Sequence, residues 1–215
     1  MIKLYGAVCG TDISALQSEL PTQWLAAWLA THKIGKNEKN ALLSLSALSV
    51  LHRSGADGTL AYDASGRPYF SDRMCDFSIT HTQNHVFCAV IDGEEPTRIG
   101  IDAEDLGRAE LLDIPSMVGR WFSDGERELY AASPTPETFL RIWTRKEAFV
   151  KYTGEGLRGL QKADTATPGD VCFFDCQQGT ILISICAPRG AIPPTEIAVL
   201  EKEWAQSSVR LRTDL

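Results

Sequence analysis

Hydrophobic residues recur at helical spacing in several stretches of the chain. In residues 36–53 the leucines at 42, 45, 48 and 51 fall on one face of a helix. Residues 11–31, 116–132 and 136–152 are also predicted to be helical, and Pro134 and Pro136 separate the last two stretches and favour the start of a new helix.

Runs rich in β-branched and aromatic residues mark the expected strands. Residues 77–82 and 85–91 are expected to pair across Gln83 and Asn84, and residues 98–104 form a short strand with an acidic end. Further strands are expected after residue 170. Helices followed by strands thus occur twice, which predicts an α+β fold. It consists of a pseudo-twofold pair of similar lobes, residues 1–97 and 98–215, each an antiparallel sheet packed with helices.

Composition and charge exclude several classes of protein. The 215 residues carry a net charge of −7, which argues against a generally nucleic-acid-binding protein. No apolar run approaches the ~20 residues that a membrane helix needs. The N-terminal residues lack the apolar core of a secretory signal, and the six cysteines form no C-x-x-C pair, so reduced thiols and a cytoplasmic location are expected.

Two carboxylates at the end of the strand 98–104 are candidate metal ligands. Asp102 and Glu104 are two residues apart, so in an extended strand they point to the same side. Their repulsion falls when a hard divalent cation such as Mg²⁺ lies between them. Taken alone, this pair is more typical of an exposed acidic strand end.

The helix predicted at 136–152 carries an unusual lysine. Lys146 belongs to an apolar stripe, so it must reach solvent or meet an anion. Glu147 and Lys151 lie one turn apart beside that stripe. The alternative is an exposed Glu–Lys ion pair, which does not account for Lys146. The two lysines and the carboxylate are suited to a phosphate and its metal.

Polar residues in two further segments complete the set of candidate site residues. The segments are GRP at 66–68 and FSITHT at 77–82. Arg67, between Gly66 and Pro68, is a possible bidentate clamp for an anion. Thr80 and His81 lie near the end of the strand 77–82, where His81 can donate to a phosphate, although a lone histidine is more often structural.

These motifs, in this order, resemble the 4'-phosphopantetheinyl transferases of the surfactin-synthetase-activating type. The blocks are GRP, FSITHT, GIDAE and WTRKEAFVKYTGEGL, which span residues 66–157, with FSDGE at 122–126 as a looser match. The length also fits the two-lobed, monomeric type rather than the half-length trimeric synthases. The resemblance implies that the active site lies in the cleft between the lobes.

The resemblance also implies roles for individual residues. Asp102, Glu104 and Glu147 match the metal ligands, and Glu147 is also the candidate base. The residues that match contacts to coenzyme A are Lys146, Lys151, Thr80, His81, Arg67 and, in the N-terminal lobe, Lys36 or Lys39. Thr80 stands where the family usually has serine.

The implied reaction moves 4'-phosphopantetheine from coenzyme A to a serine of an acyl or peptidyl carrier protein. Mg²⁺ is the expected cofactor, and neither a nucleic acid nor a membrane is an expected partner. A Mg²⁺-dependent phosphohydrolase and a non-catalytic module that binds coenzyme A or a carrier protein remain the alternatives. The natural carrier protein is left open.

Overall fold

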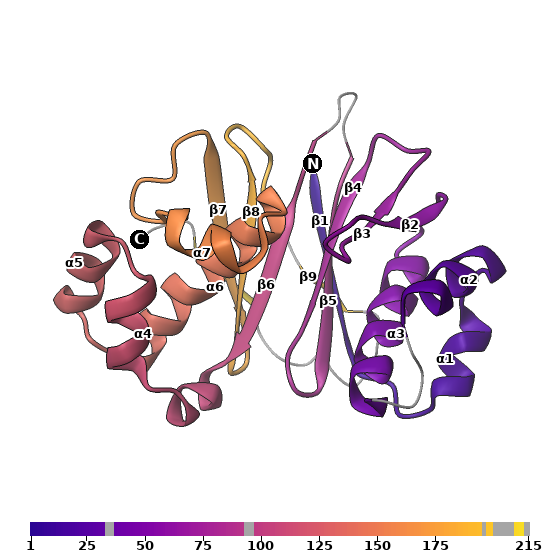
Figure 1. Ribbon diagram of the computed structural model, residues 1–215, viewed down its shortest axis with the longest axis horizontal. Helices are drawn as coiled ribbons and strands as arrows, with labels where there is room; N and C mark the ends of the chain where they lie inside the picture. The colour runs from indigo at the N-terminus through magenta and orange to yellow at the C-terminus, as the bar shows by residue number, and fades with distance from the viewer. Residues whose placement is uncertain (33–36, 93–96, 195–196, 200–208, 213–215) are drawn as a thin grey trace.

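The computed structural model describes residues 1–32, 37–92, 97–194, 197–199 and 209–212. Two four-stranded sheets form the centre of this described part (Figure 1). The first has the strand order β4-β5-β1-β9, and the second β10-β7-β8-β6. Their strands are β1 (Ile2–Val8), β4 (Asp76–His81), β5 (His85–Ile91), β9 (Ile197–Val199), β6 (Gly100–Asp105), β7 (Val171–Gln178), β8 (Ile181–Pro188) and β10 (Val209–Arg212).

Neighbouring strands are antiparallel, apart from the parallel pair of β1 and β9. Helices cover the outer sides of both sheets (Figure 1), so the α+β fold predicted from the sequence is confirmed. A short hairpin of β2 (Leu60–Tyr62) and β3 (Pro68–Phe70) stands apart from the two large sheets. Strands β1, β2 and β3 were not predicted from the sequence.

The helices fall into two groups along the chain. Those beside the first sheet are α1 (Ile13–Glu19), α2 (Thr22–Thr31) and α3 (Glu38–Arg53). Those of the second half are η1 (Leu106–Leu111), α4 (Ile114–Trp121), α5 (Asp124–Ala132), α6 (Pro136–Thr153), η2 (Gly156–Arg158) and α7 (Gly159–Lys162). Within the described ranges, no helix combines the length and the apolar character that a membrane span requires.

Two stretches that we predicted as single helices are each divided. Residues 11–31 break at Leu20, which is extended because it precedes Pro21. Residues 116–132 break at Ser123, whose side chain accepts from the backbone N–H of Glu126 while the Glu126 side chain accepts from that of Ser123. This capping box starts α5 as a separate helix.

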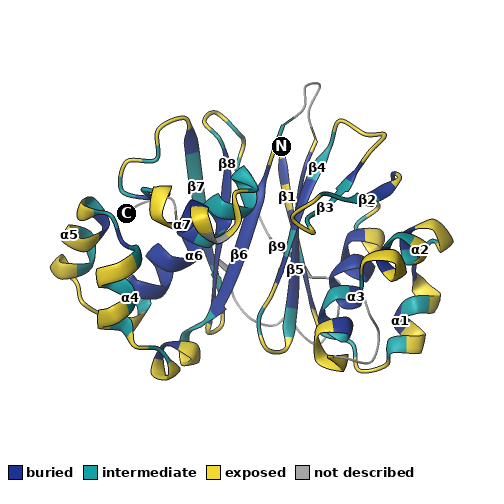
Figure 2. Ribbon diagram, viewed as in Figure 1, coloured by how far each residue is buried: buried dark blue, intermediate teal, exposed yellow. Residues whose placement is uncertain are grey.

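The inner faces of the two sheets pack against each other and form a shared core. Its buried members are Ile2, Leu4, Phe87, Ala89, Ile91, Ile99, Ile101, Ala103, Cys176, Ile181, Ile183, Ile185 and Ala187. Figure 2 shows the central strands largely buried, with exposed residues gathered on the outer helices. The shared core holds the two halves together and fixes β6 beside β4.

Polar contacts fix the alignment of β4 with β6. The Ile99 N–H donates to Asp76 Oδ2 at 2.9 Å, and the Ile101 N–H donates to Ser78 Oγ at 3.2 Å. Asp76 and Ser78 are two residues apart, so their side chains leave the strand on one side. The acidic end of β6 is thereby held next to the end of β4.

A glycine lets helix α6 approach β6 closely. A Cβ atom on Gly100 would lie 2.0 Å from the carbonyl oxygen of Ala148 and 2.5 Å from the backbone nitrogen of Tyr152. Real side chains do not tolerate such distances, so only glycine fits there. The close approach brings Glu147, the residue before Ala148, towards the carboxylates of β6.

Candidate active site

Three carboxylates from two elements meet beside the shared core. Asp102 and Glu104 come from β6, and Glu147 comes from α6. Each offers an oxygen atom within 4.8 Å of the others. Asp102 and Glu104 are buried, with exposed fractions of 5% and 4%. The strand alternation and the close α6–β6 packing at Gly100 explain why these side chains converge.

Neighbouring cationic side chains do not fully neutralise the three carboxylates. Burial, and next the charge of Asp102, raise the pKa of Glu147 to about 9. Burial and then Asp102 also raise the pKa of Glu104. Because these carboxyl groups tend to hold protons, the site favours an added positive charge.

Asp102 has one bound and one free oxygen. Its Oδ1 accepts from Lys151 Nζ at 2.8 Å and from Thr80 Oγ1 at 3.1 Å. Its Oδ2 is buried without a hydrogen-bond partner among the described residues. A buried, unpaired carboxylate oxygen beside two further carboxylates fits a hard cation such as Mg²⁺, which prefers oxygen ligands. Asp102, Glu104 and Glu147 would hold that ion.

Arg108, which we did not identify from the sequence, also faces the cluster. Its guanidinium contacts the carboxylate of Glu104, four residues earlier in the chain. Burial alone would lower the pKa of Arg108, but the contact with Glu104 outweighs it, so the pKa is raised. The spacing of four residues between Glu104 and Arg108 would indicate an ion pair within a single helix. Here Glu104 belongs to β6 and Arg108 to η1, so the spacing did not reveal the contact.

A cavity of about 470 Å³ opens over the carboxylates. The predicted site residues that line it are Thr80, His81, Asp102, Glu104, Glu147 and Lys151. His32 and Tyr62 form part of the wall on the side of the first sheet, and neither was predicted. The His32 ring stacks on Trp28, with ring centroids 4.9 Å apart, so its orientation is fixed. Both halves of the chain therefore contribute to one cavity.

His81 lies at the exposed rim of this cavity. Partial shielding from water and the neighbouring charge of Lys151 lower its pKa. The ring is therefore largely neutral at neutral pH, and it suits a hydrogen bond to a phosphate better than a permanent charge.

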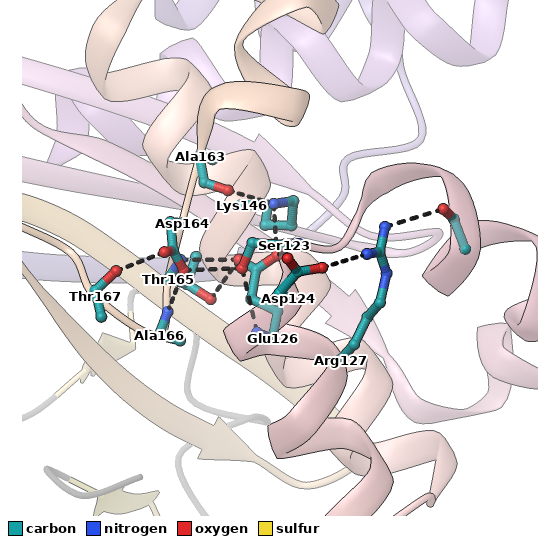
Figure 3. A network of polar contacts seen from close by, with 11 residues as sticks. Ser123, Asp124, Glu126, Arg127, Lys146, Ala163, Asp164, Thr165, Ala166 and Thr167 are labelled. Atoms are coloured by element: carbon teal, nitrogen blue, oxygen red, sulfur yellow. Dashed lines mark hydrogen bonds and ion pairs between the residues drawn. The ribbon is translucent and has the colours of Figure 1, made fainter.

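Lys146 requires a correction to the sequence analysis. We expected a bound phosphate to compensate its charge, but the structure shows a protein carboxylate in that place. Lys146 is fully buried, and its Nζ lies 2.7 Å from Glu126 Oε2 (Figure 3). It does not line the cavity. This partner lies 20 residues earlier on another helix, at the end of the loosely matching block FSDGE.

Arg67 is also placed differently from our expectation of an anion clamp. Its Nη2 lies 2.6 Å from Asp76 Oδ2 and donates to the carbonyl oxygens of Phe77 and Ile99. The guanidinium therefore connects β4 to the segment before β6. Arg67 does line a smaller neighbouring cavity of about 260 Å³, together with Lys151.

Of the two lysines predicted to contact coenzyme A from the N-terminal lobe, the structure describes Lys39. Lys39 is exposed near the start of α3 and is not among the residues that line the cavity. Lys36 lies outside the described residues.

Known proteins resemble a large part of this chain. A model of the 4'-phosphopantetheinyl transferase superfamily matches residues 98–207. The 4'-phosphopantetheinyl transferase HetI of Nostoc sp. is 35% identical over 145 residues, which cover 64% of this chain and 59% of HetI. The 4'-phosphopantetheinyl transferase AcpT of Escherichia coli K12 is 30% identical over 153 residues, which cover 69% of this chain and 73% of AcpT.

The chain belongs to the 4'-phosphopantetheinyl transferase superfamily. The matched region covers about half of the chain and contains Asp102, Glu104 and Glu147. The superfamily that the sequence motifs indicated is thus confirmed, whereas relatives named HetI and AcpT do not establish the surfactin-synthetase-activating type. The alignment spans 59% of the length of HetI.

Proposed function

We propose that this protein transfers 4'-phosphopantetheine from coenzyme A to a serine of an acyl or peptidyl carrier protein. The observation that carries the proposal is the convergence of Asp102, Glu104 and Glu147 on one cavity, with Lys151 beside them. A cation and a polyphosphate can be accommodated together there. Membership of the superfamily supplies the reaction class.

The chemistry follows from the placement of the charges. Asp102, Glu104 and Glu147 would hold Mg²⁺, which would supply positive charge to the pyrophosphate of coenzyme A and polarise the phosphorus under attack. Lys151, which lies at the edge of the same cavity, stabilises the charge that grows on the phosphate oxygens.

Glu147 accepts the proton of the carrier serine, directly or through one water. The serine oxygen forms a bond to the phosphorus next to pantetheine, and the bond from that phosphorus to the bridging oxygen breaks. The products are the phosphopantetheinylated carrier and adenosine 3',5'-bisphosphate. In the metal-free protein, burial and the charge of Asp102 raise the pKa of Glu147 to about 9. A bound cation would favour the deprotonated form that can accept the serine proton.

On the side of the first sheet, we assign the contacts to coenzyme A phosphate to His81 and Thr80. Both line the cavity, but the Thr80 hydroxyl also donates to Asp102. We further assign the chain to the two-lobed, surfactin-synthetase-activating type, with residues 1–97 and 98–215 as the lobes, although β9 (Ile197–Val199) of the second range pairs with β1 in the first sheet. The presence of two sheets in one chain, with a cavity lined from both halves, supports this assignment.

The test is a mass measurement on apo carrier proteins of the fatty-acid, polyketide and peptide types. Each is incubated with the protein, coenzyme A and Mg²⁺. We expect at least one to gain a single phosphopantetheine, with release of an equal amount of adenosine 3',5'-bisphosphate.

The same samples separate the alternatives. A phosphohydrolase would release free phosphopantetheine without modifying any carrier. A binding module would bind coenzyme A and leave it intact. Either result would contradict the proposal.

A further inference from the structure

A buried ion pair lies on α6 directly beside Glu147, outside the residues that line the cavity. Glu126 and Lys146 both have exposed fractions of 0%, and Lys146 Nζ lies 2.7 Å from Glu126 Oε2. Lys146 directly precedes Glu147, and neighbouring residues on a helix point about 100° apart. In Figure 3, Lys146 points towards Glu126 and the segment 163–167.

The Glu126 carboxylate binds further donors from two other segments. Its Oε2 also accepts from the Ser123 N–H at 2.8 Å. Its Oε1 accepts from the Thr165 N–H at 2.8 Å and from Thr165 Oγ1 at 2.9 Å. Lys146 Nζ donates in addition to the carbonyl oxygen of Ala163. The pair therefore ties α6 to the start of α5 and to the segment 163–167.

Asp164 extends this network. Its Oδ1 accepts from Ser123 Oγ at 3.0 Å and from the Ala166 N–H at 3.1 Å, and its Oδ2 accepts from Thr167 Oγ1 (Figure 3). The segment directly follows α7, and Leu160 of α7 lines the cavity. The rotation of α6 and the position of this cavity wall are thus coupled.

Stability alone does not account for such a pair. Burial lowers the pKa of Lys146, although Glu126 opposes that shift. An apolar pair of similar volume is often neutral or stabilising compared with a buried ion pair. Charged hydrogen bonds are directional, however, and five donor contacts on two side chains restrict how α6 can turn about its axis. That rotation decides where Glu147 points.

We propose that Glu126 and Lys146 are positioning residues. Their ion pair fixes the rotation of α6 and so holds the carboxylate of Glu147 against Asp102 and Glu104. The proposal rests on the proposed function, because Glu147 is the shared metal ligand and base there. It replaces the phosphate contact that we first expected of Lys146.

The main test removes both charges together, in the variant Glu126→Leu/Lys146→Met. A single substitution would leave one buried charge without its partner, whereas the double substitution does not. We expect a folded protein with a lower melting temperature than the wild type, because the N–H groups of Ser123 and Thr165 lose their acceptor. Mn²⁺ binding, measured by calorimetry without coenzyme A, should weaken by at least about tenfold, the usual scale for residues that orient metal ligands.

The matched control is Glu155→Leu/Lys162→Met. This pair has the same two residue types at 2.9 Å, but its side chains are 40% and 66% exposed and face solvent. It should leave Mn²⁺ affinity unchanged. In transfer assays, the variant that lacks Glu126 and Lys146 should lose kcat while its KM for coenzyme A stays within about twofold, because Lys151 and His81 remain.

A crystal structure of the variant Glu126→Leu/Lys146→Met gives an independent readout. We expect the Glu147 carboxylate to move away from the other two. Wild-type Mn²⁺ affinity, or an unmoved Glu147, would overturn the positioning role. If this variant does not fold, Thr165→Val replaces it; loss of one hydrogen bond to Glu126 should weaken Mn²⁺ binding several-fold, and an unchanged affinity would overturn the proposal.

Failure of the proposed function is distinguishable from failure of this inference. A wild-type protein that modifies no carrier contradicts the function. The position of Glu147 in the crystal structure of the double variant tests the role of Glu126 and Lys146 whether or not the wild type transfers phosphopantetheine.

Discussion

Helix α6 presents charged groups to two kinds of surroundings. Towards the cavity, Glu147 meets two further carboxylates, with Lys151 and Arg108 at the margins. Towards the helix's other neighbours, Lys146 and Arg145 are buried against single carboxylates. Arg145 donates to both oxygens of Asp175, at 3.0–3.2 Å from Nε and 2.8 Å from Nη2.

The carboxylates in the two surroundings differ in how far protein donors satisfy them. Asp175 also accepts from Ser184 Oγ at 2.8 Å, and Glu126 receives four donors, so these carboxylates are satisfied by the protein itself. The cavity cluster keeps an unpaired oxygen on Asp102 and a raised pKa on Glu147. The buried ion pairs of Lys146 and Arg145 hold α6 in place, whereas the three neighbouring carboxylates of the cavity are suited to bind a ligand.

The largest effect is expected for Asp102→Ala. This change removes the ligand with the unpaired oxygen, so turnover should fall below detection. The fold should remain intact, because the change also relieves repulsion among the carboxylates. Transfer assays and thermal unfolding measure the two effects. Detectable turnover at saturating Mg²⁺ with unchanged metal affinity would remove Asp102 from the site.

Glu147→Gln should have the next largest effect. It preserves shape but removes the proposed base and one ligand charge, and the transfer rate should fall about a hundredfold or more, the scale of general-base catalysis. Coenzyme A binding without metal should barely change. A wild-type rate for this variant would refute the assignment of the base.

The carboxylate cluster could be predicted from the sequence better than the buried ion pairs could. The spacing of Asp102 and Glu104, and the family motif around Glu147, indicated the cluster. The partners of Lys146 and Arg67 are 20 and nine residues away on separate elements, and no local pattern reveals such contacts. The same limit applies to Arg108 and His32, which reach the cavity through the fold.

The strands that could be predicted are those with a clear run or alternation of apolar residues. β4 and β5 are apolar runs joined by a short turn, and they were found within a residue of their bounds. β1 alternates apolar and more polar residues only from Ile2 to Tyr5, which is short for a strand signal, and in the structure it pairs with β5 and β9 on its two sides. Strand β2 has only three residues, too few for any periodicity.

Gly100→Ala tests whether the geometry of the cluster depends on close packing. The added Cβ would collide with the backbone of α6, so we expect a loss of about 1–3 kcal/mol of stability, the usual cost of overpacking. Mn²⁺ affinity should fall because Glu147 is pushed away from β6.

The control is Gly119→Ala in α4. Nothing lies within 4 Å of the added Cβ there, so this change should stabilise the helix by about 0.5–1 kcal/mol. Equal effects of the two substitutions on denaturant midpoints would contradict the packing argument.

The stability of the protein should also depend on pH. The pKa of Glu147 is raised from an ordinary value of 4.5 to about 9, by burial and then by Asp102. The folded protein therefore binds a proton that the unfolded chain has released over this range. Linkage then requires that the stability of the metal-free protein falls as pH rises from about 5 towards 9.

Melting temperatures at pH 6 and pH 8.5 in the presence of a chelator measure this dependence. Glu147→Gln has no such proton to lose, so its melting temperature should fall less between the two pH values. Saturating Mg²⁺ should likewise flatten the wild-type curve, because the ion replaces the proton as the partner of the carboxylates. A wild-type slope no steeper than that of Glu147→Gln would mean that the cluster is already compensated by Lys151 and Arg108. In that case the two sides of α6 would not differ in the way that we infer.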